Sequence, residues 1–268
     1  MPSQKRAKEL ARAKYERQQA RRAATNAHRR RIAAFGAIGG AVLVVVVLLV
    51  VVMWPSGEPT ASPQTSPSAS GQSAPAGVSC AAATPTRQPK TFKKPTAQHL
   101  KPGATIAFNT NCGTITVALA VKQAPQTTNA IAFLAANNWY NGNGCHRLTT
   151  EGIFVLQCGS PSLDGMGGPG FKIPDENLPK DGPNDYPAGT VAMANSGPGT
   201  SGSQLFFVYK DTTLPASYSI LGTMASGLDV VQFVAAAGLA TGQAGQQSGD
   251  GKPAQTTVIQ TTTLGKTG

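Results

Sequence analysis

Residues 32–54, IAAFGAIGGAVLVVVVLLVVVMW, form one uninterrupted apolar run without a charged side chain. At about 1.5 Å per residue, a helix of this length spans ~34 Å, more than the ~30 Å hydrocarbon core of a bilayer. A cleaved signal peptide is the alternative, but its apolar region is typically ~7–15 residues long and ends in a small-residue cleavage site. The end of the run and the residues after it, MWPSGEP, offer no such site. The run therefore predicts one uncleaved transmembrane helix that divides the chain.

The positive charge of the chain is concentrated before this run. The formal net charge is +11, and residues 1–31 hold eleven of the 23 Lys and Arg and two of the twelve Asp and Glu, so +9 of the total. Basic residues on one flank of a span orient that flank to the cytoplasm. We therefore expect a cytoplasmic segment 1–31, a single-pass anchor in the cell membrane at 32–54 and an extracellular remainder. Because that remainder is nearly neutral, nucleic acid is not expected as a partner.

Residues 55–96 have the composition of a linker. They are rich in Pro, Ser, Thr, Gly and Ala and contain almost no large apolar residue, as in PSGEPTASPQTSPSASGQSAPAG. Such a segment buries too little apolar surface to offset the entropy of ordering. It predicts a flexible tether that holds the next domain away from the membrane.

Residues 97–268 have the length of one ordinary domain. The runs ATIAFN (104–109) and TITVALAV (114–121) are separated by TNCG, which is typical of a hairpin. Two helices are predicted, at 125–138 and 227–238. Further strand-like runs are CHRL (145–148), IFVLQC (153–158), TVAMAN, QLFFVYK, SYSILGTM and TTVIQTTTL (256–264). Many short strands with only two helices indicate a closed or nearly closed antiparallel barrel capped at its ends.

The segment TVAMANSGPGTSGSQLFFVYK (190–210), with HR and FVLQCG upstream, resembles the cyclophilin peptidyl-prolyl cis–trans isomerases. The match is specific over VAMANSGPGTSGSQLFF and extends more loosely over about 104–264. The resemblance implies a mainly β fold, an eight-stranded antiparallel β-barrel capped by two helices. It also implies an enzyme that rotates X-Pro peptide bonds in proline-containing polypeptides. No cofactor or metal is expected, because bond rotation transfers neither atoms nor electrons.

Rotation of an X-Pro amide has a barrier of about 18–20 kcal/mol. In the twisted transition state the proline nitrogen regains a lone pair, so a cation or donor aimed at it lowers the barrier. The resemblance assigns this role to Arg147, whose planar donor group is always charged. It matches Gln157 to a glutamine that hydrogen-bonds the substrate backbone and steadies the arginine.

The resemblance also implies an apolar slot for the proline ring. Phe206 completes the catalytic set, and the substrate-binding residues are Phe154, Val155, Ala194, Asn195, Gln204, Leu214 and Tyr218. Between Arg147 and Gln157 the chain has two residues more than the usual family pattern, so the positions of Phe154 and Val155 are counted back from Gln157. Leu214 stands where tryptophan or phenylalanine is common.

The chain has four cysteines, all extracellular on the predicted topology: Cys80, Cys112, Cys145 and Cys158. Disulfides persist outside the cytoplasm, and four cysteines allow three connectivities. Cys145 and Cys158 flank one predicted hairpin, which favours that pair and leaves Cys80 with Cys112. If Arg147 and Gln157 share a strand face, however, Cys145 shares it and Cys158 points away. The pairing stays open on these two arguments.

Other patterns give weaker indications. GMGGPG (165–170) fits a phosphate-binding glycine pattern but lacks the strand before it and the helix after it, so a loop near the groove is expected. His146 should point to the face opposite Arg147, into the barrel. Asp175 and Glu176 are expected to be solvated.

Two functional classes follow from the sequence. The first is a membrane-tethered isomerase that assists the folding of exported or cell-surface proteins. The second is a non-catalytic proline-peptide-binding or chaperone module on the same fold. Arg147, Gln157 and Phe206 together favour the enzyme, whereas the two extra residues near Phe154 keep the module as the alternative.

Overall fold

The computed structural model describes residues 77–86, 90–162, 164–242 and 248–267. The predicted segment 1–31, the predicted transmembrane helix 32–54 and residues 55–76 of the predicted linker lie outside the described residues. Among the described residues, none of the helices has the length and apolar character that crossing a membrane requires.

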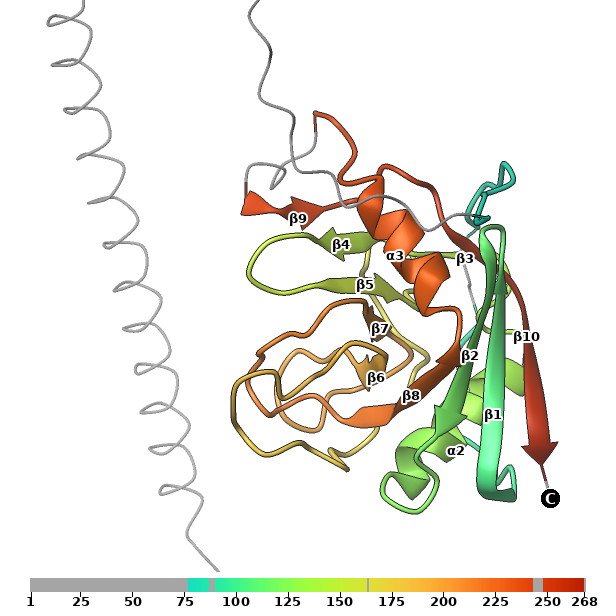
Figure 1. Ribbon diagram of the computed structural model, residues 1–268. Coiled ribbons are helices and arrows are strands. Elements are labelled where there is room, and N and C mark those ends of the chain that lie inside the picture. The colour runs from blue at the N-terminus through green and yellow to red at the C-terminus, as the bar shows by residue number, and fades with distance from the viewer. Residues whose placement is uncertain (1–76, 87–89, 163, 243–247, 268) are drawn as a thin grey trace, which may run out of the picture. The chain divides into compact units, whose positions relative to one another are not determined.

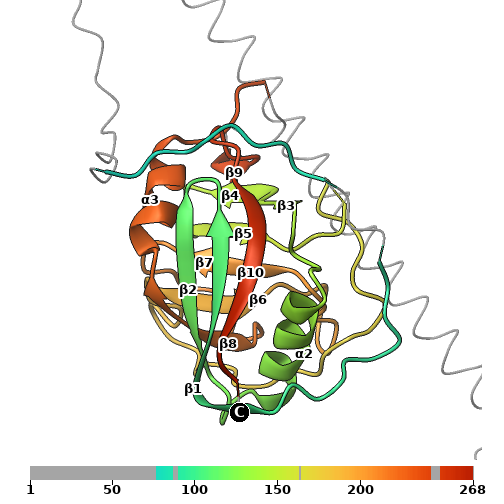
Figure 2. The ribbon, with the colours of Figure 1, turned by 90° about the vertical axis from the view of Figure 1, so that its right-hand side faces the viewer.

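One antiparallel sheet dominates the described domain, with strand order β3-β10-β1-β2-β8-β6-β7-β5-β4-β9 (Figure 1). The sheet curls, so that β1, β2 and β10 run steeply across the direction of β4 and β5 (Figures 1 and 2). The strands are β1 (Leu100–Thr110), β2 (Gly113–Leu119), β3 (Asn143–Gly144), β4 (Arg147–Thr149), β5 (Val155–Cys158), β6 (Thr190–Met193), β7 (Leu205–Val208), β8 (Ile220–Ser226), β9 (Asp250–Gly251) and β10 (Val258–Thr267).

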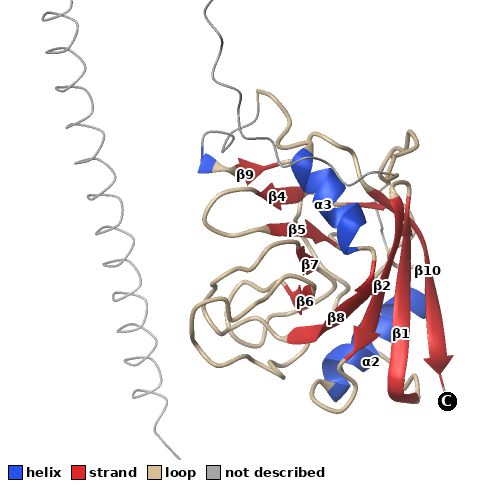
Figure 3. Ribbon diagram, viewed as in Figure 1, coloured by secondary structure: helices blue, strands red, loops and turns tan. Residues whose placement is uncertain are grey.

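The mainly β class and the two α-helices are as predicted, whereas the strand count and the closure differ (Figure 3). Ten strands are described rather than eight, because β3 and β9 add two-residue pairings to β10 and β4. Among the described residues the hydrogen-bonded row ends at these two strands, so the sheet is curled rather than a closed eight-stranded barrel.

The two helices pack against the steep part of the sheet. Helix α2 (Pro125–Ala136) contacts β10 and β1, and α3 (Leu228–Ala236) contacts β2. Glu176 accepts hydrogen bonds from the backbone N–H of Gln126 at 3.2 Å and of Thr127 at 2.8 Å. A carboxylate at a helix N-terminus satisfies free N–H groups and complements the helix dipole. Glu176 therefore caps α2 instead of being solvated as expected.

Strands β5 and β7 are buried on both faces. Leu156 and Phe207 face the main core, where Phe207 meets Phe108 edge to face at 5.8 Å. Val155 and Phe206, one position away in the chain, face a second and smaller apolar cluster with Tyr186. Side chains alternate along a strand, so neighbouring residues are divided between the two clusters. The smaller cluster forms the base of the candidate site.

Residues 77–86 and 90–96 lie on the domain, although the predicted linker 55–96 includes them. The backbone N–H of Ala81 donates to the carbonyl of Asn111 at 2.8 Å, and that of Thr86 donates to the carbonyl of Gly142 at 2.8 Å. Phe92 packs edge to face on Phe133 with the ring centroids 5.0 Å apart. Backbone hydrogen bonds and the packing of Phe92 thus attach this polar segment to the domain.

The four cysteines form two disulfides, Cys80–Cys112 and Cys145–Cys158, and the described residues contain no free cysteine. The first joins the attached segment to the turn between β1 and β2. The second closes the β4–β5 hairpin. Cys145 precedes the first residue of β4. Strand alternation therefore does not extend to it, which removes the parity argument against this pair.

Candidate functional site

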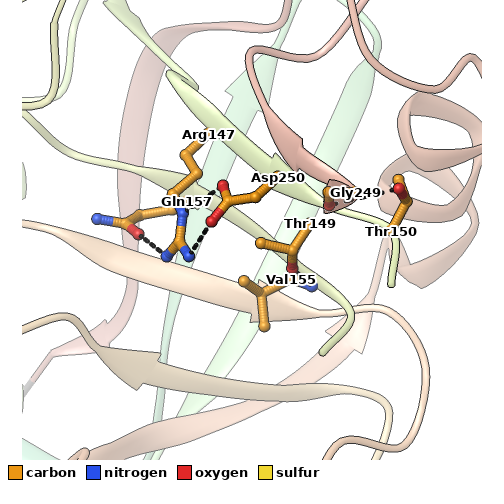
Figure 4. Close-up of polar contacts among 7 residues, drawn as sticks. All are labelled: Arg147, Thr149, Thr150, Val155, Gln157, Gly249 and Asp250. Carbon is orange, nitrogen blue, oxygen red and sulfur yellow. Dashed lines mark hydrogen bonds and ion pairs between the residues drawn. The ribbon is translucent and has the colours of Figure 1, made fainter. Parts of the chain in front are cut away.

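Arg147 and Gln157 are directly opposite each other on β4 and β5. An Nη1–H of Arg147 donates to Oε1 of Gln157 at 3.3 Å (Figure 4). Nε2 of Gln157 in turn donates to Oε1 of Gln204 at 2.9 Å. The three predicted site residues thus form one hydrogen-bonded row across the sheet. This row orients the Gln157 amide with its oxygen toward the guanidinium and its nitrogen toward Gln204.

Asp250 is part of the site, although it was not predicted from the sequence. Its carboxylate accepts two hydrogen bonds from Arg147, from Nε at 2.8 Å and from Nη2 at 2.7 Å (Figure 4). The hydrogen bond to Asp250 is the main cause that raises the pKa of Arg147, and burial opposes it. The two side chains are 39% and 42% exposed, so water screens the pair and the charge of Asp250 only partly offsets that of the guanidinium.

A cavity of about 310 Å³ lies beside the Arg147 guanidinium. Eight of the ten predicted site residues line it: Arg147, Val155, Gln157, Ala194, Asn195, Phe206, Leu214 and Tyr218. Its lining combines the apolar side chains of Val155, Phe206 and Leu214 with polar groups, as is common in small-ligand pockets. The cavity can therefore take an apolar ring with a charged donor beside it.

Phe206 and Tyr218 form one wall of this cavity, with their rings edge to face at 5.6 Å. Behind them lies Tyr186, which is fully buried and was not identified from the sequence. Its hydroxyl donates to the carbonyl of Tyr218 at 3.0 Å and accepts from the N–H of Tyr218 at 3.1 Å. Burial raises the pKa of Tyr186 to about 12, so the hydroxyl keeps its proton at neutral pH. Tyr186 thus fixes the backbone of the wall.

The segment that carries Leu214 and Tyr218 is held by acidic side chains. Oδ1 of Asp185 accepts from the N–H of Leu214 at 2.9 Å, and Oδ1 of Asp181 accepts from the N–H of Ala216 at 3.0 Å. A hydrogen bond to a carboxylate is stronger than one between neutral groups. These bonds orient a segment without regular secondary structure, so that Leu214 remains at the cavity wall.

Phe154 does not line the cavity, contrary to the prediction. It precedes β5 and packs on Tyr209 at 5.9 Å, with Nζ of Lys210 4.4 Å from its ring centre. Ile153 takes its place beside Val155 in the cavity lining. Because Val155 and Gln157 share one face, alternation directs Phe154 to the other face. Counting back from Gln157 therefore placed Val155 in the cavity lining, as the structure has it, but also placed its neighbour there.

Gln204 lines a second cavity of about 560 Å³ that shares Gln157, Ala194 and Asn195 with the first. Nε2 of Gln204 donates to the carbonyl of Gly165 at 2.9 Å, and the N–H of Ala194 donates to the carbonyl of Gln204 at 3.0 Å. The glycine-rich loop at 165–170 forms the far side of this second cavity, which agrees with the expected loop near a groove. Because the two cavities share lining residues, together they form one continuous groove.

His146 lines the first cavity instead of pointing into the barrel. Burial, followed by the positive charge of Arg147, lowers the pKa of His146 below its ordinary value of 6.5. The folded state thus favours the neutral ring, and the associated stability is present above pH 6.5 and lost as the pH falls through the lowered pKa. We expect the melting temperature of the wild type to fall more steeply below pH 6.5 than that of His146→Gln. Parallel curves for the two proteins would contradict this assignment.

The family model "Cyclophilin type peptidyl-prolyl cis-trans isomerase/CLD" matches residues 105–264. A protein of Mycobacterium leprae named "Probable peptidyl-prolyl cis-trans isomerase B" is 42% identical over 197 residues, which cover 68% of this chain and 63% of that protein. A protein of the same name from Mycobacterium tuberculosis is 42% identical over 193 residues, covering 67% and 59%. The chain thus spans less than two thirds of the length of these relatives.

A crystal structure of a cyclophilin type peptidyl-prolyl cis-trans isomerase from Cryptosporidium parvum aligns with a TM-score of 0.49 at 22% identity. The alignment covers 60% of this chain and 96% of that one.

Proposed function

Since the chain belongs to the cyclophilin type peptidyl-prolyl cis-trans isomerase family, we propose that it rotates X-Pro bonds in exported or cell-surface polypeptides and assists their folding. The observation that carries this proposal is the Arg147 guanidinium in the lining of a cavity of about 310 Å³, beside the apolar side chains of Val155, Phe206 and Leu214. The cavity receives the proline ring, and the groove that continues past Ala194 and Asn195 receives the residues before it.

Arg147 supplies the charge that the rotation requires. Three of its five N–H groups are used in the hydrogen bonds to Asp250 and Gln157, which leaves two for a substrate. Directed at the proline nitrogen, they stabilise the twisted amide, whose lone pair is localised, more than either planar isomer. The ring stays against Phe206 while the carbonyl side of the bond turns. No covalent step is involved.

The predicted membrane anchor at 32–54 is part of the proposal. The apolar run, its basic flank and two disulfides in the folded domain all favour a domain held outside the cytoplasm. In intact cells a protease should remove the domain, and the same treatment of lysed cells should cleave no additional domain. A domain that resists until the cells are lysed would contradict the proposed orientation.

A non-catalytic proline-peptide-binding module is the second candidate. The observation that favours it is Asp250, whose carboxylate contacts Arg147 and offsets part of its charge. Such a module would bind proline peptides in the same groove without changing their exchange rate. Measuring the exchange rate of a bound peptide separates the two candidates.

Phe206 and Phe207 are neighbours on β7 that face different clusters, which makes them a matched pair. Phe206→Leu should lower kcat/KM for an X-Pro peptide by about tenfold, because a smaller side chain in an apolar pocket loses contacts with the proline ring. Phe207→Leu should lower stability through the core and change kcat/KM less than about twofold, since Phe207 does not touch the cavity. Equal losses of kcat/KM in the two variants would contradict the assignment of Phe206.

A further inference from the structure

We propose that Asp250 is a positioning residue for Arg147, so that strand β9 sets the direction of the guanidinium in the site. The proposal rests on the proposed function. Strand β9 reaches the site through Asp250, whose two hydrogen bonds with Arg147 are 2.8 and 2.7 Å long. A two-point contact between planar groups fixes both the position and the plane of the guanidinium, which one hydrogen bond cannot do.

The Arg147 side chain needs the contact with Asp250 because little else holds it in place. Arg147 begins β4, and its side chain is 39% exposed, so packing alone does not fix it. The hydrogen bond from Arg147 to Gln157 is longer, at 3.3 Å, and holds one nitrogen only. A free arginine side chain carries substantial rotamer entropy. Asp250 therefore supplies the larger part of the orientation.

The two extra residues between Arg147 and Gln157 take part in this arrangement. In the longer β4–β5 connection, the N–H of Thr150 donates to the carbonyl of Gly249 at 2.7 Å, and Thr149 pairs with Asp250 (Figure 4). Gly249 has φ +64°, and a Cβ there would lie 2.5 Å from Cβ of Glu151. The connection and β9 thus fit closely against each other. The insertion does not obstruct the site; it helps to dock the strand that carries Asp250.

Asp250→Asn tests this inference, because it keeps the shape of the side chain but places an NH₂ group where an acceptor is required. In the full chain we expect kcat/KM to fall about tenfold, with kcat bearing most of the loss, since misorientation impairs the transition state more than binding. Glu151→Gln, which removes a carboxylate of the adjoining connection, serves as the control and should change kcat/KM less than about twofold.

The same substitution in an Arg147→Lys background separates positioning from a general effect on the fold. Lysine cannot form the two-point contact, so Asp250→Asn should change the remaining rate less than about twofold there. An equal loss in both backgrounds would show that Asp250 acts through the fold. An unchanged or higher kcat/KM for Asp250→Asn alone would also overturn the inference.

A second readout does not depend on catalysis. The full chain is labelled with ¹⁵N-arginine, and its NMR spectrum is compared with that of Arg147→Lys. The Nε–H signal that is missing from the variant belongs to Arg147. We expect this proton to exchange slowly with water in the wild type and rapidly in Asp250→Asn. Equal exchange in both would overturn the positioning role. If the wild type accelerates no peptide, the proposed function fails, and this signal alone decides the role of Asp250.

Discussion

Arg147→Ala is expected to lower kcat/KM for isomerisation of an X-Pro peptide by about 10²–10³-fold, the usual loss when one transition-state donor is removed. Arg147 is the cationic side chain of the cavity lining, and its two uncommitted N–H groups are the donors proposed for the proline nitrogen. The fold should persist, because the side chain is 39% exposed and Asp250, its partner, is 42% exposed and remains hydrated.

Comparing the wild type with Arg147→Ala and Arg147→Lys separates the charge of Arg147 from its planar donor group. Arg147→Lys keeps the positive charge without the planar donor group, and we expect it to lie between the wild type and Arg147→Ala in kcat/KM. Unchanged circular dichroism and peptide affinity in Arg147→Ala would show that the loss is one of turnover. If Arg147→Ala retained more than about a third of the wild-type kcat/KM, the proposed transition-state donor would be wrong.

The double substitution Cys80→Ser and Cys112→Ser is expected to lower the free energy of unfolding by about 3–4 kcal/mol, because the disulfide closes a long loop in the unfolded chain. The two cysteines are 32 residues apart in the sequence. The disulfide also holds residues 77–86 against the domain, where Ala81 is bonded to Asn111. Its loss should therefore release this segment as well.

Cys145→Ser with Cys158→Ser is the matched comparison. These cysteines are only 13 residues apart, and the chain-entropy argument gives a smaller cost of about 3 kcal/mol. Denaturant unfolding of the full chain, followed by fluorescence, measures both. A loss below about 1 kcal/mol for the first pair would contradict the entropic role assigned to the longer loop.

The sequence predicted what depends on local pattern. The helix expected at 125–138 is observed at Pro125–Ala136, and that expected at 227–238 is observed at Leu228–Ala236. Both signals are local, namely an apolar face and the residues at each end. The family resemblance implied that Gln157 steadies Arg147, and the two residues are paired across β4 and β5.

The sequence did not predict what depends on distant contacts. Asp250 is 103 residues from Arg147 and reaches the site through the pairing of β9 with β4. A strand of two residues is too short to have a recognisable sequence pattern. The sequence around Tyr186 indicates only a loop, whereas in the structure its side chain is fully buried next to Phe206. The position of Phe154, by contrast, was predictable from the sequence, because side chains alternate along a strand and Val155 and Gln157 share the opposite face.

The most direct test of the account is exchange NMR on a short X-Pro peptide with a small molar fraction of the full chain in detergent micelles. We expect cis–trans exchange on the millisecond-to-second scale, against tens to hundreds of seconds for the free peptide. We also expect Arg147→Ala to lose most of this acceleration. Peptide signals that shift on binding while the exchange rate stays that of the free peptide would contradict catalysis and leave a proline-binding module.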